Sequence, residues 1–109
     1  MKAINTKEFK DIIENVSKPT IIDFYALWCN PCKMMMPVLE GIEKDTDEVE
    51  FYKFDVDQDR EILDEYNIQN LPTLMFINSD GKITMLAGPR PKAKIINNIK
   101  KIFNVEVRV

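Results

Sequence analysis

Residues 23–33, Asp-Phe-Tyr-Ala-Leu-Trp-Cys-Asn-Pro-Cys-Lys, join an apolar strand to a helix that begins at a Cys-x-x-Cys pair. The first N–H groups of a helix have no partner within the helix, and they favour an anion beside them. In sulfur chemistry the nucleophile is the thiolate and not the thiol. We therefore hypothesise that Cys29 and Cys32 carry out reversible thiol–disulfide exchange at this junction.

The hydrophobic pattern on both sides of this stretch predicts alternating strands and helices. The expected strands are 2–4, 20–26, 50–56, 73–77 and 82–87, and the expected helices are 6–16, 31–45, 60–66 and 92–103. This order predicts an α/β fold, a mixed central sheet of about five strands with about four helices flanking both faces. Sites in such sheets form at the carboxyl ends of strands, and Cys29 lies just past such an end.

Two residues predict where the helix after the cysteine turn begins. Asn30 is a favoured N-cap residue, and Pro31 then takes the first helical position, where a missing N–H costs nothing. Pro37 within the same helix should kink it, because proline removes a hydrogen bond and crowds the preceding turn.

Length and charge narrow the function classes. A chain of 109 residues supports a single domain, 1–109. A net charge of -3 argues against nucleic acid or an anionic membrane as the main partner. No apolar run approaches the roughly 20 residues of a membrane helix. The N-terminus has no apolar signal-like region, so we expect a cytoplasmic protein.

The cysteine pair points to redox or metal chemistry, because cysteines this close together do not staple a small secreted fold. The chain contains no histidine, which excludes a Cys–His nucleophile and a His-ligated metal. Two thiols supply only half of a tetrahedral zinc site, so we expect no metal.

An ordered set of residues over nearly the whole chain resembles the thioredoxin family. The matching residues are Asp23-Phe24, Trp28-Cys29-x-Pro31-Cys32-Lys33, Pro37, Lys53, Leu71-Pro72-Thr73 and Gly88. The resemblance implies the thioredoxin fold and a protein-disulfide reductase that needs no bound cofactor. It also implies disulfide-containing client proteins, recharging by an NADPH-dependent flavoprotein thioredoxin reductase, and a monomer.

Three positions depart from the family pattern. Asn30 stands where these proteins usually carry glycine, and Leu71 replaces the more usual isoleucine or valine before the proline. The loop after Gly88 is Pro89-Arg90-Pro91, which is stiffer and more basic than is typical. None of the three removes a residue that the chemistry requires.

Cys29 is the expected attacking thiolate and Cys32 the resolving thiol. The pKa of a free cysteine is about 8.5, and lowering it by one unit takes about 1.4 kcal/mol. A helix terminus supplies roughly 0.3–1 kcal/mol when exposed. We therefore expect a hydrogen bond from the Cys32 N–H to share the stabilisation. The alternative is an inert buried pair.

Asp23 is the expected proton acceptor for Cys32. Burial on a central strand raises the pKa of a carboxyl group, which suits it to take a proton, through a water molecule. Lys53 would pair with Asp23 and moderate that shift. The alternative for both residues is a structural ion pair without a kinetic role.

The remaining site residues are expected to contact the client, together with Asn30 and Pro31. The resemblance implies a cis Leu71–Pro72 bond facing the cysteines, with the Leu71 backbone free to bind an extended client segment as an added strand. Trp28 would form a flat apolar wall, although a lone tryptophan is more often a core residue. Gly88 would let client backbone approach closely, or is an ordinary loop glycine.

Three rival functions remain open at this point. The fold could serve a complex as a binding module without redox chemistry. The protein could instead be a dedicated reductant of one enzyme, or a more oxidising exchanger tuned by Asn30. As an N-cap, Asn30 would accept an N–H near the one that Cys29 needs, so Asn30→Gly is expected to shift the reduction potential.

Overall fold

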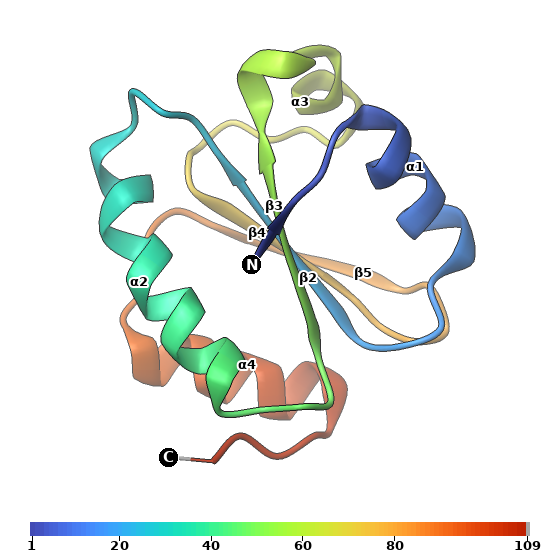
Figure 1. The fold of residues 1–109 in the computed structure, drawn as a ribbon, viewed down its shortest axis with the longest axis vertical. Helices are drawn as coiled ribbons and strands as arrows, with labels where there is room; N and C mark the ends of the chain where they lie inside the picture. Colours follow the sequence, from blue (N-terminus) through green and yellow to red (C-terminus); the bar gives the residue numbers. More distant parts are fainter. Residues whose placement is uncertain (109) are drawn as a thin grey trace.

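A five-stranded mixed sheet runs through the middle of the computed structural model, which describes residues 1–108 (Figure 1). Its order is β1-β3-β2-β4-β5. Strands β1, β3 and β2 are parallel to one another, β4 is antiparallel to β2, and β5 is antiparallel to β4. The strands are β1 (Lys2–Ala3), β2 (Thr20–Tyr25), β3 (Glu50–Asp55), β4 (Thr73–Ile77) and β5 (Ile83–Ala87). The predicted α/β architecture is confirmed.

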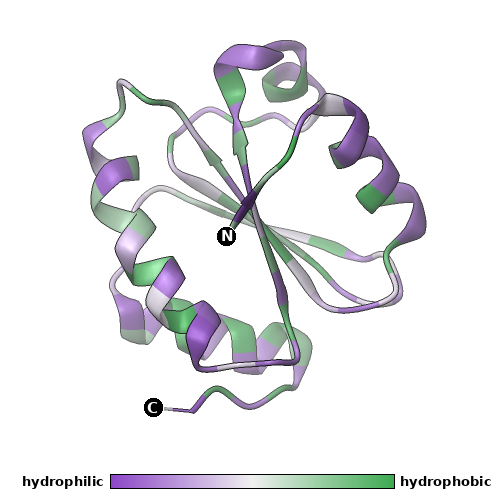
Figure 2. Ribbon diagram, viewed as in Figure 1, coloured by the Kyte–Doolittle hydropathy of each residue, from purple (hydrophilic) through white to green (hydrophobic). Residues whose placement is uncertain are grey.

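Helices cover both faces of the sheet (Figure 1). They are α1 (Thr6–Asn15), α2 (Asn30–Lys44), the 3-10 turn η1 (Val56–Gln58), α3 (Glu61–Glu65) and α4 (Lys92–Phe103). One buried cluster packs α1 and α3 onto one face, and a second packs α2 and α4 onto the other. The helices carry hydrophobic and hydrophilic residues together, as expected when only one side of a helix meets a sheet (Figure 2).

The local sequence explains how these elements begin and end. The Asn5 side chain accepts the Glu8 N–H at 2.8 Å, and Glu8 accepts the Asn5 N–H at 3.0 Å, which closes the predicted capping box of α1. Expected and observed bounds differ mainly by a residue at an end, and Pro37 lies inside α2 as expected. No helix in residues 1–108 is both long and apolar enough to cross a membrane.

The sheet register sets the place of the functional edge. Because β2 and β3 are parallel and pair Tyr25 with Asp55, both strands end at the same edge. The loop from β2 into α2 and the turn η1 after β3 therefore lie near each other. The antiparallel strand β4 begins at this edge, since Phe24 pairs with Thr73. Three chain segments thus converge on the cysteine turn.

Candidate active site

Helix α2 begins at a disulfide between Cys29 and Cys32, whose Cα atoms are 5.3 Å apart. Cys29 has the extended backbone of an N-cap residue, and its Sγ accepts the Cys32 N–H at 3.3 Å. The expected hydrogen bond to the first cysteine sulfur is confirmed. A thiolate at the same place would be stabilised by this N–H and by the positive end of the helix.

The prediction that Asn30 caps α2 is wrong. Cys29 is the N-cap, Asn30 is the first residue of the helix, and Pro31 follows it within the first turn. The usual preference for asparagine at the N-cap places the start of the helix one residue later. In the structure the Cys29 sulfur accepts the N–H that a capping oxygen would otherwise accept. Asn30 therefore does not cap the helix, and it does not compete as a cap for the N–H that binds Cys29.

The two cysteines differ in how far an incoming sulfur can reach them. Cys29 is 6% exposed and Cys32 is 1% exposed. Cys29 lines an open cavity of about 510 Å³, which Cys32 does not line. Four further predicted site residues border the same cavity: Trp28, Asn30, Pro31 and Leu71. The cavity gives an incoming sulfur a route to Cys29, which argues against an inert buried pair.

Asp23 is fully buried on β2, and neither carboxylate oxygen has a hydrogen-bond partner among the described residues. Burial raises its pKa to about 7, and the positive charge of Lys53 offsets part of the increase. Alternation along the strand places Asp23 on the face of Ile21, which packs in the cluster beneath α2. The expected raised pKa is therefore found beneath the helix that carries Cys32.

Lys53 is the register partner of Asp23 on β3. It forms no ion pair with Asp23 in the part of the chain that the structure describes. Its Nζ instead lies 5.9 Å from the centre of the Tyr25 ring. Lys53 and Cys32 line a common cavity of about 250 Å³. The geometry gives a structural ion pair between Lys53 and Asp23 no support, and it places Lys53 and Cys32 at the same cavity.

The Leu71–Pro72 bond is cis, as the resemblance implied. The Leu71 N–H and C=O make no hydrogen bond within residues 1–108, so both are available to an added strand. Gly88 contacts this segment, because its N–H donates to the Pro72 carbonyl at 2.8 Å.

Gly88 has a backbone requirement that an ordinary loop residue does not meet, a φ of +82. We expect Gly88→Ala to destabilise the fold by about 1–2 kcal/mol, because a Cβ is strained in this left-handed region. Urea unfolding measures the loss. Gly41→Ala is the matched control: Gly41 lies inside α2 with open space at its Cβ position, so the change should stabilise by roughly 0.5–1 kcal/mol. Equal effects at the two glycines would contradict the prediction.

Trp28 is 62% exposed, so the core alternative for this residue is wrong. Its indole Nε1 donates to Asp57 Oδ2 at 2.9 Å, and Asp57 also pairs with Arg60 at 2.6 Å. Sequence reasoning missed Asp57 and Arg60. The signal was present in the sequence, since the segment that follows a parallel neighbour of β2 begins at the edge where β2 ends. Trp28 and Arg60, which both donate to Asp57, line the cavity that contains Cys29.

The arrangement supports two-electron exchange. A reachable sulfur at a helix start, a second sulfur within bonding distance, and a buried carboxyl group that titrates near neutral pH are the parts that disulfide transfer needs.

Known proteins match the chain along most of its length. A family model described as Thioredoxin matches residues 1–101. The chain is 38% identical to a thioredoxin from Borreliella burgdorferi, over 94% of this chain and 89% of that protein. The fold matches Fasciola hepatica thioredoxin with a TM-score of 0.79 and 35% identity, covering 93% of this chain and 98% of that one. It matches chloroplastic thioredoxin z with a TM-score of 0.86 and 28% identity, covering 94% and 93%.

Proposed function

The chain belongs to the thioredoxin family, and on that premise we propose how its cysteine pair works and which partners it serves. The protein is a thiol–disulfide oxidoreductase, and a binding role without redox chemistry is not favoured. The observation that carries the mechanism is the position of Cys29 Sγ, at the start of α2 and beside the Cys32 N–H.

In the first step the Cys29 thiolate attacks one sulfur of a client disulfide. A bond forms between Cys29 and that sulfur, the client S–S bond breaks, and the other client sulfur leaves as a thiolate. Cys29 acts first because it is the more exposed cysteine of the pair and lines the larger cavity, which Trp28 and Leu71 also line. The hydrogen bond from Cys32 N–H, worth roughly 1.5–3 kcal/mol to a charged acceptor, exceeds the contribution of an exposed helix terminus.

In the second step Cys32 attacks Cys29 Sγ and releases the reduced client. The Cys32 thiol must first lose its proton, and Asp23 is the acceptor in this proposal. A carboxyl group with a pKa of about 7 can both accept and return a proton at neutral pH. Two electrons pass to the client, and the Cys29–Cys32 disulfide seen in the structure forms.

The cavity beside Cys29 is the proposed client-binding surface. Trp28, Asn30, Pro31 and Leu71 all line it. An extended client segment would pair with the free Leu71 backbone, pass over cis Pro72 and approach Gly88. Backbone pairing reads little side-chain sequence, which suits a reductant of many clients better than a dedicated reductant of one enzyme.

Family membership supports disulfide-containing clients and a reductase partner in general. We assign the reductase, more narrowly, to the NADPH-dependent flavoprotein class, and the protein to electron transport in the cytoplasm. A close cysteine pair suits disulfide exchange in a reducing compartment better than it suits a structural disulfide that stabilises a secreted fold. We further propose that residues 1–109 act as one domain and as a monomer.

A coupled assay tests the reductase assignment. Oxidised protein, insulin, NADPH and a flavoprotein thioredoxin reductase are combined, and NADPH consumption is followed. We expect consumption that rises with the concentration of the protein. Replacement of the reductase by glutathione and glutathione reductase is the control and should give a much slower rate. Faster turnover with glutathione would reject the thioredoxin reductase assignment. A measured Cys29–Cys32 potential would separate a reductant from a more oxidising exchanger.

A further inference from the structure

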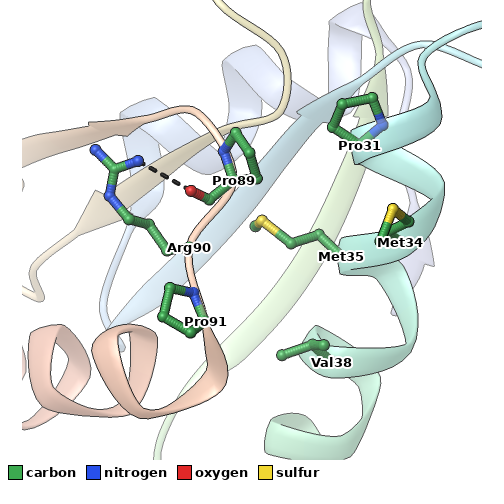
Figure 3. A pocket seen from close by; sticks show the side chains of 7 residues that line it. All are labelled: Pro31, Met34, Met35, Val38, Pro89, Arg90 and Pro91. Atoms are coloured by element: carbon green, nitrogen blue, oxygen red, sulfur yellow. Dashed lines mark hydrogen bonds between the residues drawn. The ribbon is translucent and has the colours of Figure 1, made fainter.

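A second groove opens beside the cysteine turn and is not used by the mechanism above. It is a cavity of about 480 Å³ between α2 and the loop that leads into α4, and we call it the α2–α4 groove. Met34, Met35 and Val38 line it from α2, and Pro89, Arg90 and Pro91 line it from the loop (Figure 3).

The α2–α4 groove adjoins the active site. Pro31 borders both this groove and the cavity that contains Cys29. Met35 lies about 9 Å along the helix axis from Cys29, at roughly 1.5 Å per residue. An extended chain advances about 3.3 Å per residue, so a side chain roughly three residues from a client cysteine reaches the groove.

The walls of the groove suit an apolar side chain. Figure 3 shows the Met35 side chain extending from α2 toward Pro89. Met34 is 76% exposed, and it is one of three large hydrophobic side chains that remain exposed in the described part of the chain, with Leu27 and Trp28. All three belong to the segment around the cysteines. Methionine side chains adapt to differently shaped partners.

Arg90 gives the rim of the groove a positive charge close to the client path. Its Nη1 donates to the Pro89 carbonyl at 2.9 Å, and it lies 3.4 Å from the position that a Cβ on Gly88 would occupy. Arg90 forms no ion pair within residues 1–108, so its charge is free for a partner. The prolines on both sides of Arg90 each fix a backbone angle, which limits the loss of entropy on binding.

The neighbouring charges have the same sign. The first turn of α4 contains Lys92 and Lys94, both exposed, and no acidic residue. The chain as a whole has a net charge of -3, so this cationic rim runs against the overall balance. A client that carries a carboxylate here is attracted, and one that carries an amine is repelled.

We propose that the α2–α4 groove and Arg90 select client segments with an apolar residue and an acidic residue about three positions from the reacting cysteine. The apolar side chain enters between α2 and the loop, and Arg90 binds the carboxylate beside Gly88. This inference rests on the proposed function, since it adds a preference among clients of the same cysteine pair.

Peptides that release a coloured thiol test the proposal. Each contains one cysteine joined by a disulfide to thionitrobenzoate, so attack by Cys29 on the peptide sulfur expels the coloured thiolate. In one set of peptides, leucine and glutamate stand together about three residues from the cysteine, either before it or after it. A matched set replaces the glutamate with lysine. The protein is reduced beforehand with dithiothreitol and desalted, and single-turnover rates are measured at low salt.

We expect the glutamate peptide with the productive placement to react roughly fivefold faster than its lysine counterpart, in line with an exposed ion pair at favourable geometry. Arg90→Glu should remove or invert this ratio. Lys82→Glu is the matched control, because it makes the same change in net charge at the exposed β4–β5 turn, remote from the site, and it should keep the wild-type ratio. Met34→Gln should lower the preference for leucine over serine at the apolar position about twofold.

The outcomes separate the two levels of the argument. Equal rates for glutamate and lysine peptides, or a ratio that survives Arg90→Glu, would overturn the groove proposal while the reductase function stands. A preference that fades as protein concentration rises would place a second copy of the chain in the groove and would also overturn it. Failure of wild-type protein to reduce insulin would refute the proposed function itself.

Discussion

Cys29→Ser should reduce the rate of client disulfide reduction to that of the assay without protein. A serine hydroxyl is not ionised near neutral pH and cannot form the mixed disulfide that begins the exchange. The substitution removes one sulfur at the N-cap of α2 and replaces it with an oxygen that accepts the same Cys32 N–H, so the fold should persist. Insulin reduction by dithiothreitol, with and without the variant, measures the effect.

Cys32→Ser is the matched control for this result. It keeps the attacking sulfur and removes the resolving one, so it should accumulate a mixed disulfide between Cys29 and the client. Mass spectrometry under non-reducing conditions detects the adduct. Trapping on Cys32 in the Cys29→Ser variant, at the wild-type rate, would reverse the proposed roles. Biological activity that survives Cys29→Ser undiminished would revive the binding-module hypothesis.

Much of the site could be predicted because its residues lie next to one another in sequence. The run from Asp23 to Lys33 places a buried carboxyl group, a strand end and a helix start in fixed order, and each follows from local patterning. Leu71-Pro72 and Gly88 are distant from this run in the sequence, and only the family resemblance placed them at the site. The structure confirms the cis bond and the hydrogen bond that joins Gly88 to Pro72.

The misses come from interactions that local pattern does not encode. Asparagine is a better N-cap than cysteine by general preference, yet the backbone turns helical one residue early and the sulfur becomes the cap. The indole N–H of Trp28 donates to Asp57, and this contact could be predicted only from the register of β2 and β3. Pairing of Lys53 with Asp23 was expected from charge alone, whereas the structure places the ammonium over the Tyr25 ring.

Asp23→Asn should stabilise the oxidised protein at pH 8 by roughly 4 kcal/mol and change its stability little at pH 4. Burial raises the pKa of Asp23 from 3.8 to about 7, so the folded state binds a proton more tightly than the unfolded state does. Wild-type stability therefore falls as the pH rises from about 4 through 7, and it levels off above that range. Asparagine is neutral throughout and removes this dependence. Urea unfolding of both proteins across this pH range measures it.

The same substitution should slow the second half of the reaction, because Cys32 loses its proton acceptor. At neutral pH the mixed disulfide should persist longer in Asp23→Asn than in wild type, although the variant is the more stable protein. Asp11→Asn is the matched control: it removes one carboxylate from an exposed position of α1 and should change stability by no more than about 0.5 kcal/mol. A variant that gains stability but resolves mixed disulfides at the wild-type rate would leave Asp23 as an unpaired buried charge without a role in proton transfer. Gain and loss together are expected only if the buried carboxyl group is retained for its chemistry, since it weakens the fold at the pH where the exchange proceeds.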